Sequence, residues 1–305
     1  MPEQTRSQDA PSPPGAPEAV RVDEALVRRL VARQFPQWAG LPLARFPSAG
    51  TVNAVYRLGE RLAVRLPLGP DGAADVRKEH RWLPRLAPLL PVAVPEVLGR
   101  GEPGEGYPWP WTVHRWIEGA HPVQGDVPRA AELATELAAF VTALRRAPAA
   151  GAPPAYRGRP LRAVDAATRA AIDALGDDID AAAATAAWER ALAAPEWQGP
   201  PTWLHSDLMP GNLLLANGRL AAVLDFGTMG VGDPAADLIP AWNLLPANAR
   251  ETFRAALAPG EAEWRRGHGW ALSMALIQLP YYRDRNPVLA ANARHTIAQT
   301  LAHPV

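Results

Sequence analysis

The spacing of apolar and polar positions changes once along the chain, and the change divides the protein into two predicted parts. Between Ala44 and Leu66 the apolar residues form short strand-like runs, 54–58 and 62–66, which predict a β-meander. After a predicted hinge at 118–119, apolar residues recur at spacings of three and four, most clearly over 130–145. We therefore expect a small N-terminal lobe built on a β-sheet and a larger, mainly helical C-terminal lobe.

Other periodic segments complete both lobes. Asp23 can cap a helix that stops at Pro36, and Ala73 to Leu86 has the apolar spacing of a helix. Two short apolar runs, Val92 to Val97 and Trp111 to Trp116, are predicted as strands. Further helices are predicted at 161–194 with a break near 176–178, at 250–257, at 263–279 and at 287–301.

The ends of the two lobes follow from these patterns. Residues 1–18 are rich in Pro, Ser, Gln and Ala and contain little that can be buried, so we expect a disordered tail. The N-lobe would then cover 19–117, and the C-lobe would cover 118–305.

A tight hairpin is predicted at Asn217-Gly218, because both residues tolerate positive φ and short apolar runs flank them. With a two-residue turn, Asn212 faces Val223 and Asp225 lies just past the end of the second strand. The amide and the carboxylate then converge at the open end of the hairpin. Mg²⁺ prefers oxygen ligands and keeps substrate phosphates as further ligands, so this pair predicts a magnesium site.

A third polar residue, Asp207, precedes Asn212 by five positions. A carboxylate close to the metal, but with a different role, is suited to accept the proton of a hydroxyl whose oxygen attacks phosphorus. The alternative is structural: His205 and Asp207 could form a loop salt bridge, and Asp225-Phe226-Gly227 could be a turn after a buried strand. Four polar positions at this spacing around a predicted hairpin favour the catalytic interpretation.

These residues resemble the catalytic loop and metal motif of protein kinases, His-x-Asp-x-x-x-x-Asn followed by Asp-Phe-Gly. The stretches His-Ser-Asp-Leu-Met-Pro-Gly-Asn and Asp-Phe-Gly-Thr-Met-Gly-Val-Gly-Asp-Pro-Ala-Ala-Asp-Leu resemble the aminoglycoside and macrolide phosphotransferases more closely. The likeness spans roughly Arg45 to the C-terminus. It implies an α+β, protein-kinase-like two-lobe fold, Mg²⁺, ATP or GTP as co-substrate, and a small-molecule hydroxyl as phosphoryl acceptor.

The resemblance implies a phosphate-binding turn in the N-lobe. The segment 48–53 lies between the first two predicted strands, and its Gly50, Thr51 and Asn53 would cover the nucleotide phosphates with backbone amides. A simple hairpin turn is the alternative, because one glycine is a weak signal by itself.

The resemblance also implies a cation on the third strand that pairs with the α- and β-phosphates. Here Arg65 stands in place of the usual Lys, so the charge is retained while a planar fork replaces a compact ammonium. Glu79, on the helix that follows, is the expected ion-pair partner of Arg65. Alternatively Glu79 is a solvated residue that Arg77, Lys78 or Arg81 holds locally.

Further roles are carried over from the same likeness. The nucleobase would hydrogen-bond the backbone of Arg115 and Ile117, with His114 limiting the depth of its pocket. His205 would brace the catalytic loop by hydrogen bonding. Asp233 can cap the helix that starts at Pro234, and the resemblance implies that it steadies the catalytic loop without taking part in the chemistry.

Composition narrows the possible partners. The 305 residues are 48% hydrophobic and 20% charged, as in a soluble globular protein. With 31 basic and 31 acidic side chains the net charge is zero, which argues against a nucleic-acid or anionic-membrane surface. The absence of cysteine excludes disulfides and leaves oxygen or His ligands for a metal. Without a signal pattern or a long apolar run, we expect a cytoplasmic enzyme.

The acceptor molecule stays open. The segment 161–196 carries seven carboxylates against three arginines, and it is either an attractive surface for a polycation or a solvated helix face. An aminoglycoside should require such carboxylates, whereas a macrolide should require a broad apolar pocket. The alternatives are a small-metabolite kinase of the choline- or homoserine-kinase type and a catalytically silent nucleotide-binding regulator. The sequence leaves the oligomeric state unknown.

Overall fold

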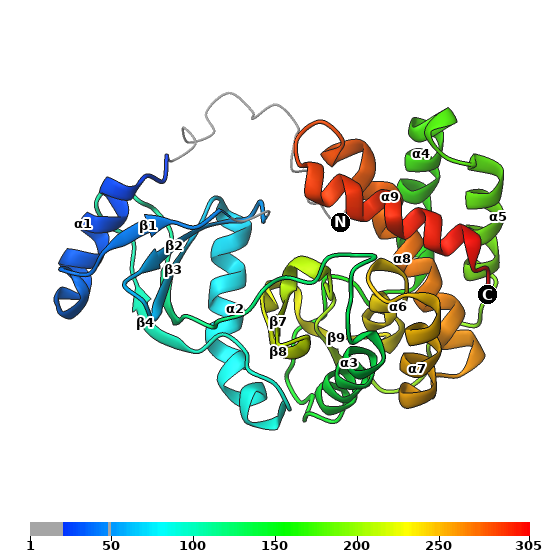
Figure 1. Ribbon diagram of the computed structural model, residues 1–305, viewed down its shortest axis with the longest axis horizontal. Coiled ribbons are helices and arrows are strands. Elements are labelled where there is room, and N and C mark those ends of the chain that lie inside the picture. The colour runs from blue at the N-terminus through cyan, green and yellow to red at the C-terminus, as the bar shows by residue number, and fades with distance from the viewer. Residues whose placement is uncertain (1–20, 48–49) are drawn as a thin grey trace.

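The computed structural model describes residues 21–47 and 50–305, which form two lobes joined side by side (Figure 1). The predicted tail and Ser48-Ala49 of the predicted phosphate-binding turn lie outside the described residues. None of the helices within the two described ranges combines the length and the apolar character needed to cross a membrane.

The N-lobe is an antiparallel sheet with the strand order β1-β2-β3-β5-β4, and the predicted meander forms its first part. The helix α1 (Glu24–Gln34) begins at Asp23, whose carboxylate accepts a hydrogen bond from Leu26 N at 2.9 Å, as predicted. Apolar side chains of α1 and of the sheet form a separate N-lobe core. The strands are β1 (Leu43–Arg45), β2 (Asn53–Leu58), β3 (Leu62–Pro67), β4 (Val97–Gly101) and β5 (Trp111–Arg115).

The strand predicted at 92–97 is wrong in position, because β4 begins only at Val97. Val92 and Val94 pack against the core of the C-lobe, and Ala93 forms a bridge with Ala222 of the hairpin there. The apolar run thus reflects burial at the junction of the lobes, and its spacing alone does not distinguish this from a strand.

The helix α2 (Pro70–Leu86) lies between the two lobes (Figure 1). Its lower end buries Trp82, Leu83 and Leu86 in the hydrophobic core of the C-lobe. The ring of Trp82 meets that of Trp203 edge-on, with 5.1 Å between the centroids. The helix is therefore anchored to the C-lobe, although it follows β3 of the N-lobe sheet.

The C-lobe is mainly helical, with two short β pairs next to the junction. The predicted break near 176–178 is confirmed, since a 3₁₀ turn separates α4 from α5 there. The helices are α3 (Ala130–Arg145), α4 (Asp165–Leu175), α5 (Ala181–Leu192), α6 (Pro240–Asn243), α7 (Ala247–Leu257), α8 (Glu261–Tyr282) and α9 (Pro287–Ala302). The strands are β6 (Thr202–Leu204), β7 (Leu213–Ala216), β8 (Arg219–Val223) and β9 (Gly230–Gly232). Short 3₁₀ turns are η1 (Pro36–Trp38), η2 (Ala87–Leu89), η3 (Leu161–Val164), η4 (Gly176–Asp178), η5 (Pro210–Asn212), η6 (Phe226–Thr228) and η7 (Pro234–Leu238).

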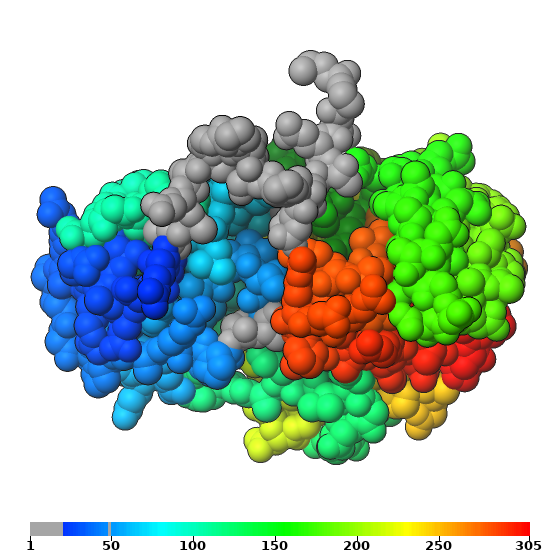
Figure 2. Space-filling view, turned by 90° about the horizontal axis from the view of Figure 1, so that it is seen from above, coloured from blue at the N-terminus to red at the C-terminus, as the bar shows by residue number. Residues whose placement is uncertain are grey.

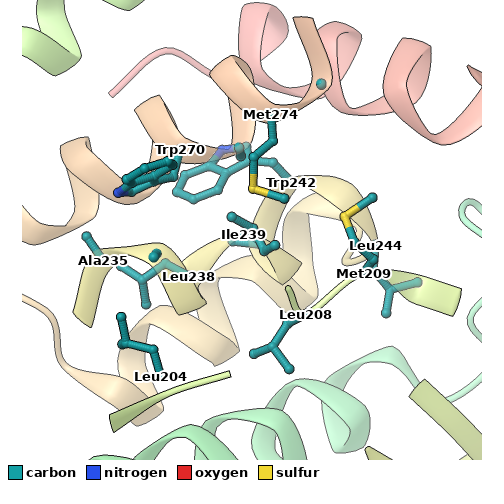
Figure 3. Close-up of a cluster of buried hydrophobic side chains, with 14 of the residues drawn as sticks. Leu204, Leu208, Met209, Ala235, Leu238, Ile239, Trp242, Leu244, Trp270 and Met274 are labelled. Carbon is teal, nitrogen blue, oxygen red and sulfur yellow. The ribbon is translucent and has the colours of Figure 1, made fainter. Parts of the chain in front are cut away.

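The apolar core of the C-lobe reaches the segment that follows β6. Figure 3 shows Leu208 and Met209 of this segment among buried side chains of η7 and α8, which include Leu238 and Met274. Burial of these neighbours fixes the backbone of the loop that carries Asp207.

The predicted hairpin of β7 and β8 is confirmed around Asn217-Gly218, where both residues have positive φ. Its predicted register is wrong beyond the turn. An additional residue, Ala221, shifts the ladder so that Leu213 faces Val223, and Asn212 instead accepts a backbone hydrogen bond from Leu224. A bulge of this kind bends the strand and re-aims the side chains that follow it.

Both chain crossings between the lobes are tied to this hairpin. Ala93 N donates to Ala221 O at 3.2 Å, and Val223 N donates to Ala93 O at 3.0 Å. On the other edge, Ala120 and Leu215 exchange backbone hydrogen bonds of 2.9 and 2.8 Å. The predicted hinge at 118–119 therefore runs along β7.

Candidate active site

Arg65 stands on β3 with its guanidinium between two carboxylates. Nη1 lies 2.6 Å from Glu79 Oε2 on α2, and Nη2 lies 2.8 Å from Asp225 Oδ1 past the end of β8. The predicted ion pair of Arg65 with Glu79 is thus present, and the surface alternative for Glu79 is wrong because this side chain is buried. The contact with Asp225 was not predicted.

The charge of Arg65 is secured by its surroundings. Burial acts to lower the pKa of Arg65, but the carboxylates of Glu79 and Asp225 outweigh it and raise that pKa, so the side chain stays cationic. With its amide oxygen turned toward the guanidinium, Asn53 of β2 accepts hydrogen bonds from Nη2 at 3.0 Å and from Nε at 3.1 Å.

The catalytic loop follows β6, and His205 is buried at its start. His205 Nδ1 accepts a hydrogen bond from Asp207 N at 3.2 Å, which leaves Nε2 to donate to Leu224 O at 2.9 Å. The ring also meets Phe226 edge-on, with 4.7 Å between the centroids. His205 therefore ties the loop of Asp207 to Leu224, between the end of β8 and Asp225, which is the bracing position expected for it.

The carboxylate that steadies this loop is Asp237 of η7, so the role carried over to Asp233 is wrong. Asp237 Oδ2 accepts from His205 N at 2.8 Å, and Oδ1 accepts from Ser206 N at 2.7 Å. Asp233 instead caps η7 through Ala235 N at 3.0 Å, as predicted, and pairs with Arg266 at 2.6 Å. Burial raises the pKa of Asp237, while the two backbone donors and the charge of Arg145 oppose this rise.

Asp207 is held on both carboxylate oxygens. Oδ2 accepts from Asn212 Nδ2 at 2.9 Å, and Oδ1 accepts from Arg157 Nη1 at 3.0 Å. Asn212 Nδ2 also donates to Asp207 O at 2.8 Å. Since these bonds use only the amide nitrogen of Asn212, its oxygen remains the atom able to bind a hard cation.

Asp225 lies directly after β8 in the left-handed region, at φ 57°, and its side chain is 43% exposed. One oxygen contacts Arg65, and the other is available for a ligand. Within the described ranges, no group of three or more His, Asp or Glu side chains could hold a metal ion without help. Asn212 and Asp225 fit Mg²⁺ as a partial oxygen ligand set that phosphates and water complete.

The expected nucleobase site lies where β5 ends. Arg115 N donates to Glu96 O at 2.9 Å, so the carbonyl of Arg115 and the backbone of Ile117 are the groups that could serve a base. His114 is buried on β5, with Nε2 2.7 Å from Thr112 Oγ1. Burial lowers the pKa of His114 to about 3, so its ring is neutral at physiological pH.

The described part of the phosphate-binding turn approaches the C-lobe. Gly50 is exposed, and Thr51 Oγ1 lies 3.4 Å from the hydroxyl of Tyr282 at the end of α8. Figure 2 shows the end of α8, in orange, beside the blue N-lobe. The expected phosphate-binding groups therefore face the same junction as Arg65 and Asp225.

Two residues of the site were not found from the sequence. Arg157 reaches Asp207 from a Pro/Gly-rich connection fifty positions earlier, and this connection carries no local signal for it. Asp237 belongs to the quoted Asp-Pro-Ala-Ala-Asp stretch, so the signal was present, but only the fold shows which acid turns toward the loop.

Comparison with known proteins places this geometry in context. The model of the phosphotransferase enzyme family (APH) matches residues 44–270. The GDP and kanamycin complex of APH(2")-IIia has a TM-score of 0.73 at 19% identity, covering 90% of this chain and 98% of that chain. Macrolide 2'-phosphotransferase MphH from Brachybacterium faecium, as the apoenzyme, has a TM-score of 0.59 at 24% identity, covering 92% and 98%. The likeness confirms the expected kinase-like fold; no curated protein matches the chain in sequence.

Proposed function

This chain belongs to the phosphotransferase enzyme family, and we propose that it moves the γ-phosphoryl group of ATP or GTP to a hydroxyl of an aminoglycoside- or macrolide-type antibiotic. The observation that supports this most is the junction of the lobes. There Asp207 is hydrogen-bonded to Asn212, and Asp225 is hydrogen-bonded to Arg65. A proton acceptor, a partial metal ligand set and a phosphate-binding cation thus meet in one place.

In the proposed reaction the acceptor hydroxyl gives its proton to Asp207 as its oxygen bonds to the γ-phosphorus. The bond from that phosphorus to the β–γ bridging oxygen breaks, and the nucleoside diphosphate leaves with this oxygen. Asn212 and Asp225 would hold Mg²⁺, which when bound neutralises charge on the phosphates. No covalent enzyme intermediate is needed, because positioning and charge neutralisation supply the catalysis.

Arg65 would bind a phosphate oxygen with the one N–H, on Nη1, that Glu79, Asp225 and Asn53 leave unused among the described residues. Glu79 orients the fork from one side, and a planar guanidinium can serve a carboxylate and phosphate oxygens together. Gly50 and Thr51 would approach the phosphates from the turn above. The backbone of Arg115 and Ile117 would bind the base.

The charges of α4 and α5 bear on the acceptor. Arg169 pairs with Asp165 at 2.8 Å and with Glu189 at 3.3 Å, and Arg283 pairs with Asp178 at 3.2 Å. Glu196 pairs with Arg162, and Asp180 caps α5. Of the seven carboxylates, only Asp173 and Asp177 have no partner within the described residues. The seven carboxylates still outnumber the paired arginines Arg162, Arg169 and Arg283, so this surface keeps a negative excess that would attract a polycationic aminoglycoside, and the assay below distinguishes this acceptor type from a macrolide.

A panel assay tests the function. The purified chain is incubated with Mg²⁺ and either ATP or GTP, in turn with aminoglycosides, macrolides, choline and homoserine, and phosphorylated product is measured by mass spectrometry. Transfer to an antibiotic is expected. Transfer to choline or homoserine alone would support the metabolite-kinase alternative, and tight nucleotide binding without any transfer would support the silent regulator. Antibiotic resistance in a host strain, through a cytoplasmic enzyme, would be the cellular counterpart.

A further inference from the structure

Arg157 is a basic residue in the connection between α3 and η3, and its side chain turns inward to the catalytic loop. Nη1 lies 2.8 Å from Ser206 O and 3.0 Å from Asp207 Oδ1. Only 17% of the side chain is exposed. A cation this well buried beside a carboxylate belongs to the internal structure of the site.

The backbone around Arg157 is anchored to the C-lobe on both sides. Tyr156 N donates to Thr228 O at 3.1 Å, and Asp233 N donates to Gly158 O at 2.8 Å. The guanidinium also lies over the ring of Tyr156, 5.0 Å from its centroid. Arg157 therefore extends from a fixed segment, which allows its side chain to set the position of another group.

The residue that Arg157 holds through the backbone is Ser206, which lies in the left-handed region at φ 69°. L-residues rarely adopt this conformation, so it needs support from its surroundings. Asp237 accepts from Ser206 N, while Arg157 donates from its own N to Ser206 Oγ at 2.7 Å and from Nη1 to Ser206 O. Ser206 immediately precedes Asp207, so these bonds fix the position of the Asp207 backbone from which its carboxylate extends.

Arg157 and Asn212 together determine how the carboxylate of Asp207 is rotated. Each contributes one N–H, to Oδ1 and to Oδ2 respectively. An ionised carboxylate has about four lone-pair positions, so two bonds hold its plane and still leave sites for a proton. Orientation of a reacting group in this manner lowers a barrier without any contact with the substrate.

We propose that Arg157 is a positioning residue for phosphoryl transfer, which holds Ser206 and Asp207 so that the carboxylate meets the acceptor hydroxyl in the reactive orientation. The inference rests on the proposed function, because it requires Asp207 to be the proton acceptor. Arg157 acts through Asp207 and takes no proton itself, since an Arg side chain remains protonated in proteins.

The test compares Arg157→Ala with Arg157→Lys and with the control Arg162→Ala, each assayed with the acceptor that the panel identifies. Arg162 lies five positions away, its side chain is 73% exposed, and among the described residues it pairs only with Glu196. We expect Arg157→Ala to lower kcat about tenfold to a hundredfold, with little change in the KM for nucleotide. Arg157→Lys should recover part of the loss, because an ammonium lacks the fork that spans Ser206 O and Asp207 Oδ1. Arg162→Ala should match the wild type.

Rescue with added guanidinium separates positioning from a general structural role. Guanidinium should raise kcat of Arg157→Ala by supplying the missing donors, and it should not raise kcat of Asp207→Asn. If Arg157→Ala fails to bind nucleotide, Arg157→Gln replaces it in the same comparison. A wild-type kcat in either folded variant, or a loss that appears only as a higher KM for nucleotide, overturns the inference. Full transfer by Asp207→Asn would instead reject the proposed function, so the two failures are distinguishable.

Discussion

Arg65 and Asp225 are in direct contact, with 2.8 Å between Nη2 and Oδ1, so the proposed phosphate-binding cation of the N-lobe touches a proposed metal ligand of the C-lobe. The other arm of the same fork reaches Glu79. The three side chains thus form one charged unit across the junction, and removal of any member changes the position or the charge of the others.

Asp207→Asn should abolish transfer while nucleotide binding persists. The variant removes the proton acceptor but keeps a side chain of the same size and leaves Arg65 and Asp225 in place, so we expect a loss in kcat of roughly a hundredfold or more. Steady-state kinetics and a nucleotide dissociation constant measure the two effects separately. Asp126→Asn, an exposed substitution in the segment before α3, is the matched control; near-wild-type turnover in Asp207→Asn would contradict the assignment.

Asp225→Ala should nearly eliminate Mg²⁺-dependent nucleotide binding. Asn212→Ala should raise the Mg²⁺ requirement less severely, because an amide contributes less charge to a hard cation than a carboxylate does. Titration of Mg²⁺ against bound nucleotide, with removal of the metal by a chelator as the reference, measures both shifts. If neither variant responds to the metal concentration, the hairpin end does not hold the ion.

Glu79→Ala should lower nucleotide affinity, because Arg65 would keep its charge but lose its direction. The double variant with Arg65→Ala should be scarcely weaker than either single variant, since the two residues act as one unit. Arg65→Ala should also lower the free energy of unfolding by about 3–5 kcal/mol, since it leaves the buried carboxylate of Glu79 without its partner, whereas Glu79→Ala should cost less because Asp225 still pairs with Arg65. Nucleotide dissociation constants and denaturant unfolding of the four proteins decide this; strict additivity would show that the residues act independently.

Asp237→Ala should destabilise the chain and slow transfer, although Asp237 touches no reacting group. Two buried backbone N–H groups, those of His205 and Ser206, would lose their acceptor at a cost of about 1–3 kcal/mol each. Thermal unfolding and kcat are measured together. Asp180→Ala, which removes the exposed cap of α5, should cost only about 1 kcal/mol and leave kcat unchanged. Equal effects from the two variants would show that Asp237 is only a cap.

His114 should make the fold less stable in mild acid. Its pKa of about 3 in the folded protein lies below the unfolded value of 6.5, so the unfolded chain binds the extra proton as the pH falls from about 6.5 toward 3. Stability from this residue is therefore present above pH 6.5 and lost through that window. His114→Gln should unfold with a weaker dependence on pH between about 7.5 and 5. An unchanged dependence would show that other groups carry the acid sensitivity.

The features of the fold that depend only on neighbouring residues were predicted correctly from local sequence patterns. The β-meander, the turn at Asn217-Gly218 and the cap at Asp23 each follow from a few adjacent side chains, and all three are present. The bulge at Ala221 was missed because the opposite edge of β8 pairs with Ala93, more than a hundred positions earlier. The spacing of residues within β8 contains no information about a contact with such a distant segment.

The residues of the candidate site also fall into those that the sequence predicts and those that only the fold reveals. Arg65 and Glu79 lie on consecutive elements, so their ion pair could be expected from position in the chain. Asp233 and Asp237 are one helical turn apart and both face inward, so the loop-steadying role was assigned to Asp233 when it belongs to Asp237. Arg157 depends on the path of an irregular connection, which is decided by where β9 and η6 stand in the finished lobe.

The attachment of both chain crossings to one hairpin determines how the two lobes can turn against each other. Ala93 is bonded to β8 and Ala120 to β7, so a rotation of the N-lobe sheet about these two attachments would have its axis along this hairpin. Points near a rotation axis move least, and Asn212 and Asp225 lie at the end of the hairpin. The metal ligands would keep their mutual distance during such a rotation, whereas Arg65, farther out on β3, would travel. Opening of the lobes would therefore move Arg65 relative to Asn212 and Asp225, while the distance between these two proposed metal ligands would stay the same.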